Sequence, residues 1–249
     1  MNRITFLGSG GARIMLSTQV LATGGMIISL DDTHFSLDPG PGALVNIFKH
    51  NINPTDLHGI IISHRHLDHS ADANVMIEAM TKSGKIKNGQ VFAPSDALDV
   101  DPVILKYLRG YLKEIMYLRP LSNYVINDLP FTTSMPHHHG TEETYGFLFH
   151  AKDTTLGYIP DTVFFPELLD FYKANVLIIS MLRLEKSNFA HLCVDDVEVI
   201  IKSIKPNITI LTHFGLQIHQ TGPNKIAEYL EEKTGLKVIA AADGLEINF

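Results

Sequence analysis

The chain has 249 residues, of which 45% are hydrophobic, so it is long enough to bury a sizeable core. Its 20 basic and 27 acidic residues give a formal net charge of −7, which lacks the basic footprint expected of a protein that binds duplex nucleic acid but does not exclude a small anionic substrate. The single cysteine, the absence of an apolar signal core at the start and the absence of a long apolar run predict a cytoplasmic protein without a disulfide or a membrane span.

The first half of the chain predicts strands followed by alternating helices and strands. Short apolar runs closed by turn residues predict strands in "RITFLGSGG", "MIISLDD" and "HFSLDPGPG", so the first 40 residues read as β-structure. A helix is expected at 41–51, a strand buried on both faces at 57–63 and a helix at 70–82. In the less regular region 83–120, "DPVILKYLRGYLKEI" predicts an amphipathic helix with Pro102 in its first turn.

The second half continues the alternation to the end of the chain. Strands are expected at 124–138, 145–150, 154–159, 174–180 and 207–213, helices at about 194–204 and 223–234, and a closing pair of strands in "KVIAAADG" and "EINF". This pattern predicts an α/β fold with two sheets in the middle and helices outside. Because no linker, repeat or low-complexity tract interrupts the chain, we expect a single domain over 1–249.

Residues 62–70, "ISHRHLDHS", place four metal-ligating side chain types in six positions directly after the buried strand. They are His64, His66, Asp68 and His69. His64 and His66 would project to the same side of an extended chain, and the next two residues would turn into a helix. Imidazole and carboxylate ligands together suit zinc, iron or manganese. A solvated loop that happens to be rich in histidine is the alternative, and we disfavour it because the ligands are so dense.

The segment resembles the His-x-His-x-Asp-His signature of the metallo-β-lactamase superfamily, and the resemblance extends along nearly the whole chain. It implies a four-layer αβ/βα sandwich, the metallo-β-lactamase fold. It also implies further ligands in later loops, for which "PHHHGTEETYGF", "GYIPDT" and "ITILTHFG" nominate His139, Asp161 and His213. "HFSLDPGPGA" resembles an early element whose aspartate, here Asp38, supports the metal loop. Taken alone, Asp161 would read as a turn cap and His213 as a core histidine.

Three consecutive histidines, His137 to His139, occupy the third-histidine position of the resemblance. Counting back seven residues from Gly146 reaches His139, whereas His138 lies eight residues back. Alternation along a persisting strand would put His137 and His139 on one face and His138 on the other. We therefore predict His139 as the ligand, keep His138 as the alternative, and expect His137 to be a neighbour that lines the cleft or is exposed.

The resemblance implies a two-metal centre. One ion would be held by His64, His66 and His139, and the other by Asp68, His69 and His213, with Asp161 between them. Zinc is favoured, with manganese and iron as the other candidates. A hydroxide shared by the two ions would attack phosphorus or a carbonyl carbon. In this scheme Asp68 counts as a catalytic residue as well as a ligand.

His191, in "SNFAHLCVDD", is the second predicted catalytic residue. The phosphodiesterase branch of the superfamily, which includes the tRNA 3′-processing endonuclease and cyclic-phosphate phosphodiesterases, has a histidine at a similar place that is thought to protonate the leaving oxygen. An imidazole that titrates near neutrality suits this role. The alternative is a helix-capping neighbour at the rim of the site. Cys193, two residues on, is expected to be a buried small residue rather than a nucleophile.

The predicted activity is a metal-dependent phosphodiesterase acting on a small phosphodiester. Compared with the tRNA-processing enzymes, the chain lacks a Pro-Thr-x-x-Arg-Asn segment after "FLGSGG" and a basic arm between 70 and 130, and "LCVDD" follows His191 in place of Glu-Ala-Thr. The alternatives are a tRNA-processing enzyme, a carboxylic ester or lactone hydrolase, an iron dioxygenase of the same superfamily, and a non-catalytic metal-binding sensor or partner protein. A small anionic substrate is the expected partner, and a homodimer remains open. Arg13, Arg65 and Arg183 lie in or near site-forming loops and could contact a phosphate oxygen, but surface solvation is the role we expect for each.

Overall fold

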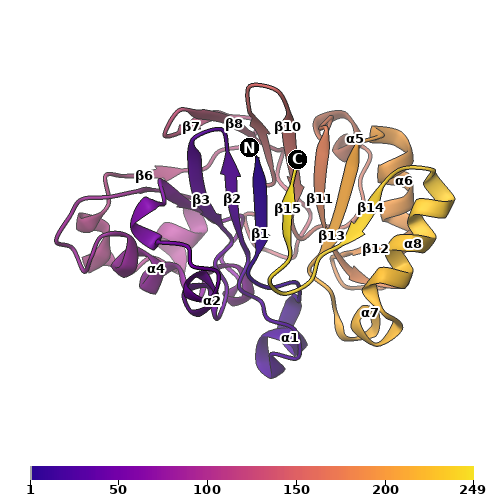
Figure 1. Ribbon diagram of the computed structural model, residues 1–249, viewed down its shortest axis with the longest axis horizontal. Coiled ribbons are helices and arrows are strands. Elements are labelled where there is room, and N and C mark those ends of the chain that lie inside the picture. The colour runs from indigo at the N-terminus through magenta and orange to yellow at the C-terminus, as the bar shows by residue number, and fades with distance from the viewer. Residues whose placement is uncertain (1) are drawn as a thin grey trace.

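Two β-sheets lie face to face in the middle of the molecule, with helices on their outer sides (Figure 1). The structure is a computed structural model that describes residues 2–249. In the first sheet the strand order is β15 (Glu246–Asn248), β1 (Arg3–Phe6), β2 (Met26–Leu30), β3 (Thr33–Leu37), β4 (Gly59–Ile61), β5 (Gln90–Ala93) and β6 (Glu114–Tyr117). In the second it is β14 (Val238–Ala240), β13 (Ile208–Thr212), β11 (Val176–Arg183), β10 (Thr155–Ile159), β9 (Phe147–His150), β8 (Leu129–Thr133) and β7 (Asn123–Ile126), and β12 (Leu192–Cys193) pairs with β11.

The helices are α1 (Ala12–Thr18), α2 (Ala43–Lys49), α3 (Leu67–Ser70), α4 (Ala73–Met80), α5 (Glu167–Phe171), α6 (Val194–Ile204), α7 (Leu216–Thr221) and α8 (Pro223–Thr234), together with the short turns η1 (Pro54–Asp56), η2 (Asp96–Val100) and η3 (Lys106–Tyr111). Helices α2 and α4 pack on the outer face of the first sheet and α5, α6 and α8 on that of the second, while α1 lies below the ends of the strands (Figure 1). The helices predicted at 194–204 and 223–234 are confirmed as α6 and α8. Within residues 2–249, no helix has the length and apolar character that a membrane crossing requires.

Strand alternation divides the core of the first sheet into two layers. In β4 and β5, Ile61 and Phe92 point into the cluster between the sheets. Their neighbours Ile60 and Val91 belong instead to a second cluster that the helices α2 and α4 complete. Because successive side chains of a strand point to opposite faces, a strand buried on both faces reads as a continuous apolar run. This explains why the segment 57–63 has no polar alternation.

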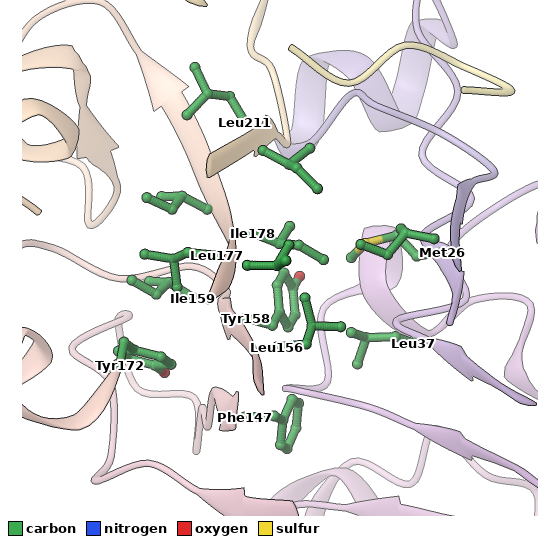
Figure 2. Close-up of a cluster of buried hydrophobic side chains, with 14 of the residues drawn as sticks. Met26, Leu37, Phe147, Leu156, Tyr158, Ile159, Tyr172, Leu177, Ile178 and Leu211 are labelled. Carbon is green, nitrogen blue, oxygen red and sulfur yellow. The ribbon is translucent and has the colours of Figure 1, made fainter. Parts of the chain in front are cut away.

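The main core lies between the sheets, where side chains from both meet (Figure 2). Met26 and Leu37 come from the first sheet, and Phe147, Leu156 and Tyr158 come from the second (Figure 2). All five are buried, and burial of each large apolar side chain contributes roughly 1.5–3 kcal/mol. This packing fixes the two sheets relative to each other, and with them the loops at the ends of their strands.

Four strands of each sheet run in parallel. These are β3 to β6 in the first sheet and β10, β11, β13 and β14 in the second. The carboxyl ends of parallel strands open onto one edge of a sheet, which is where α/β proteins assemble their sites. The loops after β4, β10 and β13 are therefore placed to meet.

The helix predicted in the segment 101–115 is wrong. The structure has the 3₁₀ turn η3 in its middle and then the strand β6, which pairs in parallel with β5. The side chain of Arg109 donates hydrogen bonds to the backbone carbonyls of Leu98 and Ile104, so it closes a loop rather than following a helix face. Hydrogen bonds to the edge of β5 satisfy the backbone groups of residues 114–117. A local sequence pattern could not predict this strand because it does not contain the partner.

Two further expectations need correction. The first 40 residues are not all β-structure, because α1 begins at Ala12, directly after the glycine pair of "GSGGAR". The β-structure expected at 124–138 is a hairpin of β7 and β8 that turns at Asn127, whose φ of 52° lies in the left-handed region, and it ends before the histidines. The strand ends at Thr133, so the triple histidine lies in a loop.

Candidate metal centre

The predicted site residues lie in loops that follow strands of both sheets. His64 follows β4, and the short helix α3 beyond it carries Asp68 and His69. Asp161 follows β10, and His213 follows β13 with a left-handed φ of 63°. A positive φ is uncommon for a residue with a side chain. The edge where the parallel strands end thus gathers residues that are up to 149 positions apart in the chain, from His64 to His213.

One group of potential ligands consists of His64, His66, His139 and Asp161, whose ligand atoms all lie within 4.8 Å of one another. His66 Nδ1 is 3.0 Å from His64 Nε2 and 3.1 Å from His139 Nε2. Asp161 Oδ2 is 3.6 Å from His139 Nε2 and 4.0 Å from His64 Nε2. Three imidazoles and one carboxylate therefore face a common point.

A second group consists of Asp68, His69 and His213. His69 Nε2 lies 3.1 Å from His213 Nε2, which is 3.2 Å from Asp68 Oδ2. Asp161 joins this group to the first, because its Oδ1 is 3.3 Å from His213 Nε2 and its Oδ2 is 3.6 Å from His69 Nε2. All seven side chains predicted as ligands belong to these two groups.

Asp38 orients the histidines of the metal loop from behind. Its Oδ2 accepts hydrogen bonds from His69 Nδ1 at 2.9 Å, from Ser63 Oγ at 2.7 Å and from the Tyr158 hydroxyl at 2.9 Å. Since the Ser63 hydroxyl donates to Asp38, it accepts from His64 Nδ1 at 3.0 Å. Both histidines therefore donate from Nδ1 and turn Nε2 towards the cluster.

The other two histidines of the first group are oriented in the same manner. His139 Nδ1 donates to the backbone carbonyl of Ala190 at 3.0 Å, which leaves its Nε2 as an acceptor. His66 has Glu142 Oε1 3.5 Å from its Nε2, so its Nδ1 is the acceptor that faces inward. Partners of this kind fix the ring orientation and tautomer of metal-binding histidines.

The donor set fits a divalent cation. Three acceptor lone pairs converge, and neutral acceptors cannot hydrogen-bond to one another; they belong to His64 Nε2, His66 Nδ1 and His139 Nε2. In addition, Asp161 Oδ1 is buried without a hydrogen-bond partner among residues 2–249. Buried polar atoms normally have hydrogen-bond partners, and a metal ion would serve as the common partner of these nitrogen and oxygen atoms.

The electrostatics of the cluster also favour positive charge at its centre. Burial lowers the pKa of His69, but the carboxylates of Asp68, Asp161 and Asp38 outweigh burial and raise it well above its usual value. Burial would raise the pKa of Asp161, yet His213, His191 and His69 hold it well below its usual range. The carboxylates of this site stay ionised and favour a positive charge on a buried imidazole. The same negative potential would stabilise a bound metal cation.

His191 lies at the mouth of the cluster. Its Nδ1 is 3.6 Å from Asp161 Oδ2, and its ring stacks on that of His213 with 5.8 Å between centroids. Burial lowers the pKa of His191 to about 4, against the opposing effect of Asp161. Burial therefore favours the neutral form of this imidazole. Asp161, His191 and His213 also form a third group with ligand geometry.

A cavity of about 360 Å³ opens over the two groups. His66, Asp68, His139, Asp161 and His191 line its inner side, and Leu67 with Ala12, Arg13 and Leu16 of α1 lines the other. The backbone N–H of Ala12 donates to Asp68 Oδ2 at 2.7 Å, which ties α1 to the metal loop. Sequence patterns missed α1 as a wall of the site, and the glycine pair before Ala12 was the only signal of a change in the backbone.

The family can now be assigned. A family model described as the β-lactamase superfamily domain matches residues 33–214. The chain belongs to the β-lactamase superfamily. An uncharacterized protein of Methanocaldococcus jannaschii is 34% identical over 98% of this chain and 94% of its own length.

Solved structures share the fold of this superfamily member. The metallo-β-lactamase fold protein YhfI from Bacillus subtilis is 18% identical, covers 99% of this chain and 98% of its own, and superposes with a TM-score of 0.83. A diphosphatase of the PhnP family is also 18% identical, covers 100% of this chain and 98% of its own, and has a TM-score of 0.74. The predicted α/β metallo-β-lactamase fold is thus confirmed. Membership supports a hydrolase, and the two donor groups support binding of divalent metal.

The triple histidine of this superfamily member separates into three environments. His139 is buried in the first ligand group, whereas His138 is exposed and stacks on Phe165 with 4.4 Å between ring centroids. His137 is buried, and its Nε2 is hydrogen-bonded to the Tyr172 hydroxyl at 2.8 Å. The three histidines do alternate in burial, but they do not form a strand. Hydrogen bonds between the backbone of His138 and both Thr162 and Val163 hold them in a loop.

Alanine substitutions of adjacent histidines should therefore have opposite outcomes. We expect His139→Ala to weaken metal binding by more than about 100-fold, since even the outer partners of metal ligands are worth about 10- to 100-fold in affinity. His138→Ala, the matched control, should bind metal as the wild type does. Titration with a competing zinc chelator measures both, and equal affinities of the two variants would refute the assignment of His139 as a ligand.

The three arginines near the site differ in their availability. Arg65 is not merely solvated, because its guanidinium contacts Asp101 at 2.6 Å, Glu142 at 3.4 Å and Asp96 at 3.6 Å. Arg183 lies over the ring of Phe189, 4.3 Å from its centroid. Arg13 is exposed and lines the cavity. Of the three, only Arg13 combines a place on the cavity with freedom from an ion pair among residues 2–249.

Gly11 permits the close approach of α1 to the site. A methyl group at this position would overlap the imidazole ring of His213, although its φ of −151° is open to any residue. We expect Gly11→Ala to lower the free energy of unfolding by about 1–3 kcal/mol and to weaken metal binding, because the ring must move. Gly110→Ala is the matched control, since a methyl group there meets nothing within 4 Å. Urea unfolding with and without zinc provides the measurement, and equal stabilities of the two variants would contradict the steric argument.

Proposed function

We propose that the protein is a binuclear metal-dependent phosphodiesterase that acts on a small phosphodiester. The observation that carries the proposal is the sharing of Asp161 by two donor groups that open into one cavity of about 360 Å³. His64, His66 and His139 would hold one ion and Asp68, His69 and His213 the other, with Asp161 between them. Nitrogen and oxygen ligands in this mixture favour zinc, with manganese and iron as alternatives. Divalent ions, when bound, lower the pKa of water and stabilise negative charge on a phosphate.

Asp68 positions groups on the cavity floor. Burial would raise its pKa, but His69 and His213 outweigh burial and hold the pKa well below its usual range, so the carboxylate stays ionised. Its Oδ2 accepts from the Ala12 N–H at 2.7 Å and faces His213 Nε2 at 3.2 Å. The ionised carboxylate is thus held in place from two sides and can accept a hydrogen bond from, and so orient, the water that adds to phosphorus.

His191 is the residue we propose as the proton donor to the leaving oxygen. In the hydrolysis, water adds its oxygen to phosphorus, the phosphorus–oxygen bond of the ester breaks, and the leaving oxygen takes up a proton. Burial keeps the free imidazole neutral, but an anionic phosphate beside it favours the protonated form and raises the pKa again. His191 lines the cavity and is partly open to it, so it can meet a bound ester.

Phosphoester chemistry on a small substrate is supported by the surroundings of the cavity. The structurally similar PhnP-family protein is a diphosphatase, which acts on phosphate-containing substrates. Residues 70–130, where a tRNA-processing enzyme would need a basic arm, fold back onto the body as α4, β5, η2, η3 and β6. With a net charge of −7, the chain offers little to a polyanionic partner.

Hydrolysis of bis(p-nitrophenyl) phosphate by zinc- or manganese-loaded protein tests the proposal. His191→Ala should lower turnover of an alkyl phosphodiester, a poor leaving group, by about 100-fold or more, and should affect a p-nitrophenyl ester much less, because an acidic phenol leaves without a proton. His150→Ala, an exposed histidine on β9, is the control. Turnover of carboxylic esters or lactones alone would favour the esterase alternative. Absence of any turnover in folded, metal-loaded protein would favour a sensor or partner protein.

A further inference from the structure

A second, larger groove continues from the metal cavity. It has a volume of about 600 Å³, and it shares His66 and Leu67 with the first cavity. Leu67 lies between two predicted ligands, yet the residue is 60% exposed at the junction. A substrate that reaches the metal centre therefore has room to extend over Leu67 into the groove.

The polar side chains of this groove are already engaged with the protein. Arg65 contacts three carboxylates, and Ser70 Oγ donates to the carbonyls of Arg65 and His66. The amide of Asn74 donates to the Val103 carbonyl at 2.8 Å and accepts from the Leu105 N–H at 2.9 Å. What remains for a ligand is mainly apolar surface, contributed by Leu67, Ala71, Pro102, Val103 and Leu105.

Charge differs between the two ends of the combined site. Arg13 is the one arginine or lysine among the side chains that line the metal cavity. The groove instead holds Arg65 and Asp101, whose charges are paired at 2.6 Å, and the Arg65 guanidinium also lies near Asp96 and Glu142. One negative charge on the ligand would be attracted by Arg13, whereas a second one in the groove would meet only a cation that three carboxylates already neutralise.

We propose that the substrate is a singly charged phosphodiester with one bulky, uncharged apolar or aromatic substituent. The substituent lies on the surface of Leu67, Val103 and Leu105, and Arg13 donates to a non-bridging phosphate oxygen. This inference rests on the proposed phosphodiesterase function and names its substrate class. It also explains why an apolar residue is exposed within the metal loop, since the ligand would cover Leu67.

Calorimetric binding of two phosphodiesters to zinc-loaded protein tests the apolar groove without relying on turnover. Diphenyl phosphate should bind at least about tenfold more tightly than dimethyl phosphate, because a phenyl ring buries far more apolar surface than a methyl group. Leu105→Asp, at a residue that is 47% exposed, should remove most of this preference, whereas Val125→Asp, 52% exposed on β7, should preserve it. Equal binding of the two ligands by the wild-type protein would overturn the inference.

The same titrations test Arg13. Arg13→Gln should weaken both ligands by about tenfold or more, because a charge-assisted hydrogen bond to phosphate is lost. Arg119→Gln, an exposed arginine outside both cavities, should change neither affinity. An Arg13→Gln variant that binds as the wild type does would overturn the role of Arg13. Turnover of bis(p-nitrophenyl) phosphate with no preference for diphenyl phosphate would overturn only the substrate class, whereas selective binding without turnover would overturn the phosphodiesterase.

Discussion

Replacement of Asp161 by asparagine should reduce the kcat/KM for bis(p-nitrophenyl) phosphate by about 1000-fold, which corresponds to about 4 kcal/mol. Among residues 2–249, Asp161 is the one carboxylate whose oxygens face both donor groups, at 3.3 Å from His213 and 3.6 Å from His69 and His139. Asparagine keeps the volume but removes the charge that offsets two cations. We therefore expect the metal content of the variant to fall together with its activity.

Metal analysis by mass spectrometry and circular dichroism separate this effect from misfolding. The folded Asp161→Asn protein should contain fewer bound ions than the wild type. Asp153→Asn, at an exposed carboxylate, is the matched control and should retain both metal content and turnover. A variant with asparagine at position 161 that keeps two ions and full activity would show that Asp161 does not bridge the groups.

Removal of the metal should produce the second large effect, a fall in Tm on the order of 10 °C. A ligand present at 1000 times its Kd stabilises the folded state by about 4 kcal/mol, and 1 kcal/mol shifts the Tm of a chain of this size by roughly 2–4 °C. The physical reason lies in the cluster, where lone pairs of His64, His66 and His139 face one another when no cation separates them.

Scanning calorimetry in the presence of a chelator measures this shift. The same chelator saturated with zinc beforehand is the control for effects of the reagent itself. Asp161→Asn should show a smaller shift than the wild type, because it begins with less metal. A Tm that is independent of the chelator, in protein shown to lose its ions, would mean that the cluster is stable without a cation.

Local patterns were sufficient for much of this architecture. The run 57–63 predicted a strand buried on both faces, and apolar periodicity predicted α6 and α8. The dense cluster of ligand types in 64–69 could be recognised because the end of one strand and the turn after it place those side chains within a few residues. Short-range geometry determines such features, so the amino-acid order alone reveals them.

Where local patterns predicted the wrong structure, pairing between distant segments determined the right one. Residues 114–117 form β6 by pairing with the edge of β5, although the apolar residues of the flanking sequence have helical periodicity. Contact with His213 and Asp68 placed α1 over the site, where the sequence predicted only strands. Such choices depend on which partner satisfies the backbone or fills the space, and a short window of sequence does not contain that partner.

The site, like the fold, was determined partly by the sequence alone and partly by the tertiary structure. The sequence by itself determined the chemical types of the donors and, with the help of a resemblance, nominated His139, Asp161 and His213. Only the tertiary structure brought these residues within ligand distance of the metal loop, exposed His138, engaged Arg65 with carboxylates and buried His191 so that its pKa falls to about 4. The reason is that distances and burial arise from the packing of two sheets, whereas the type of a ligand atom belongs to each residue alone.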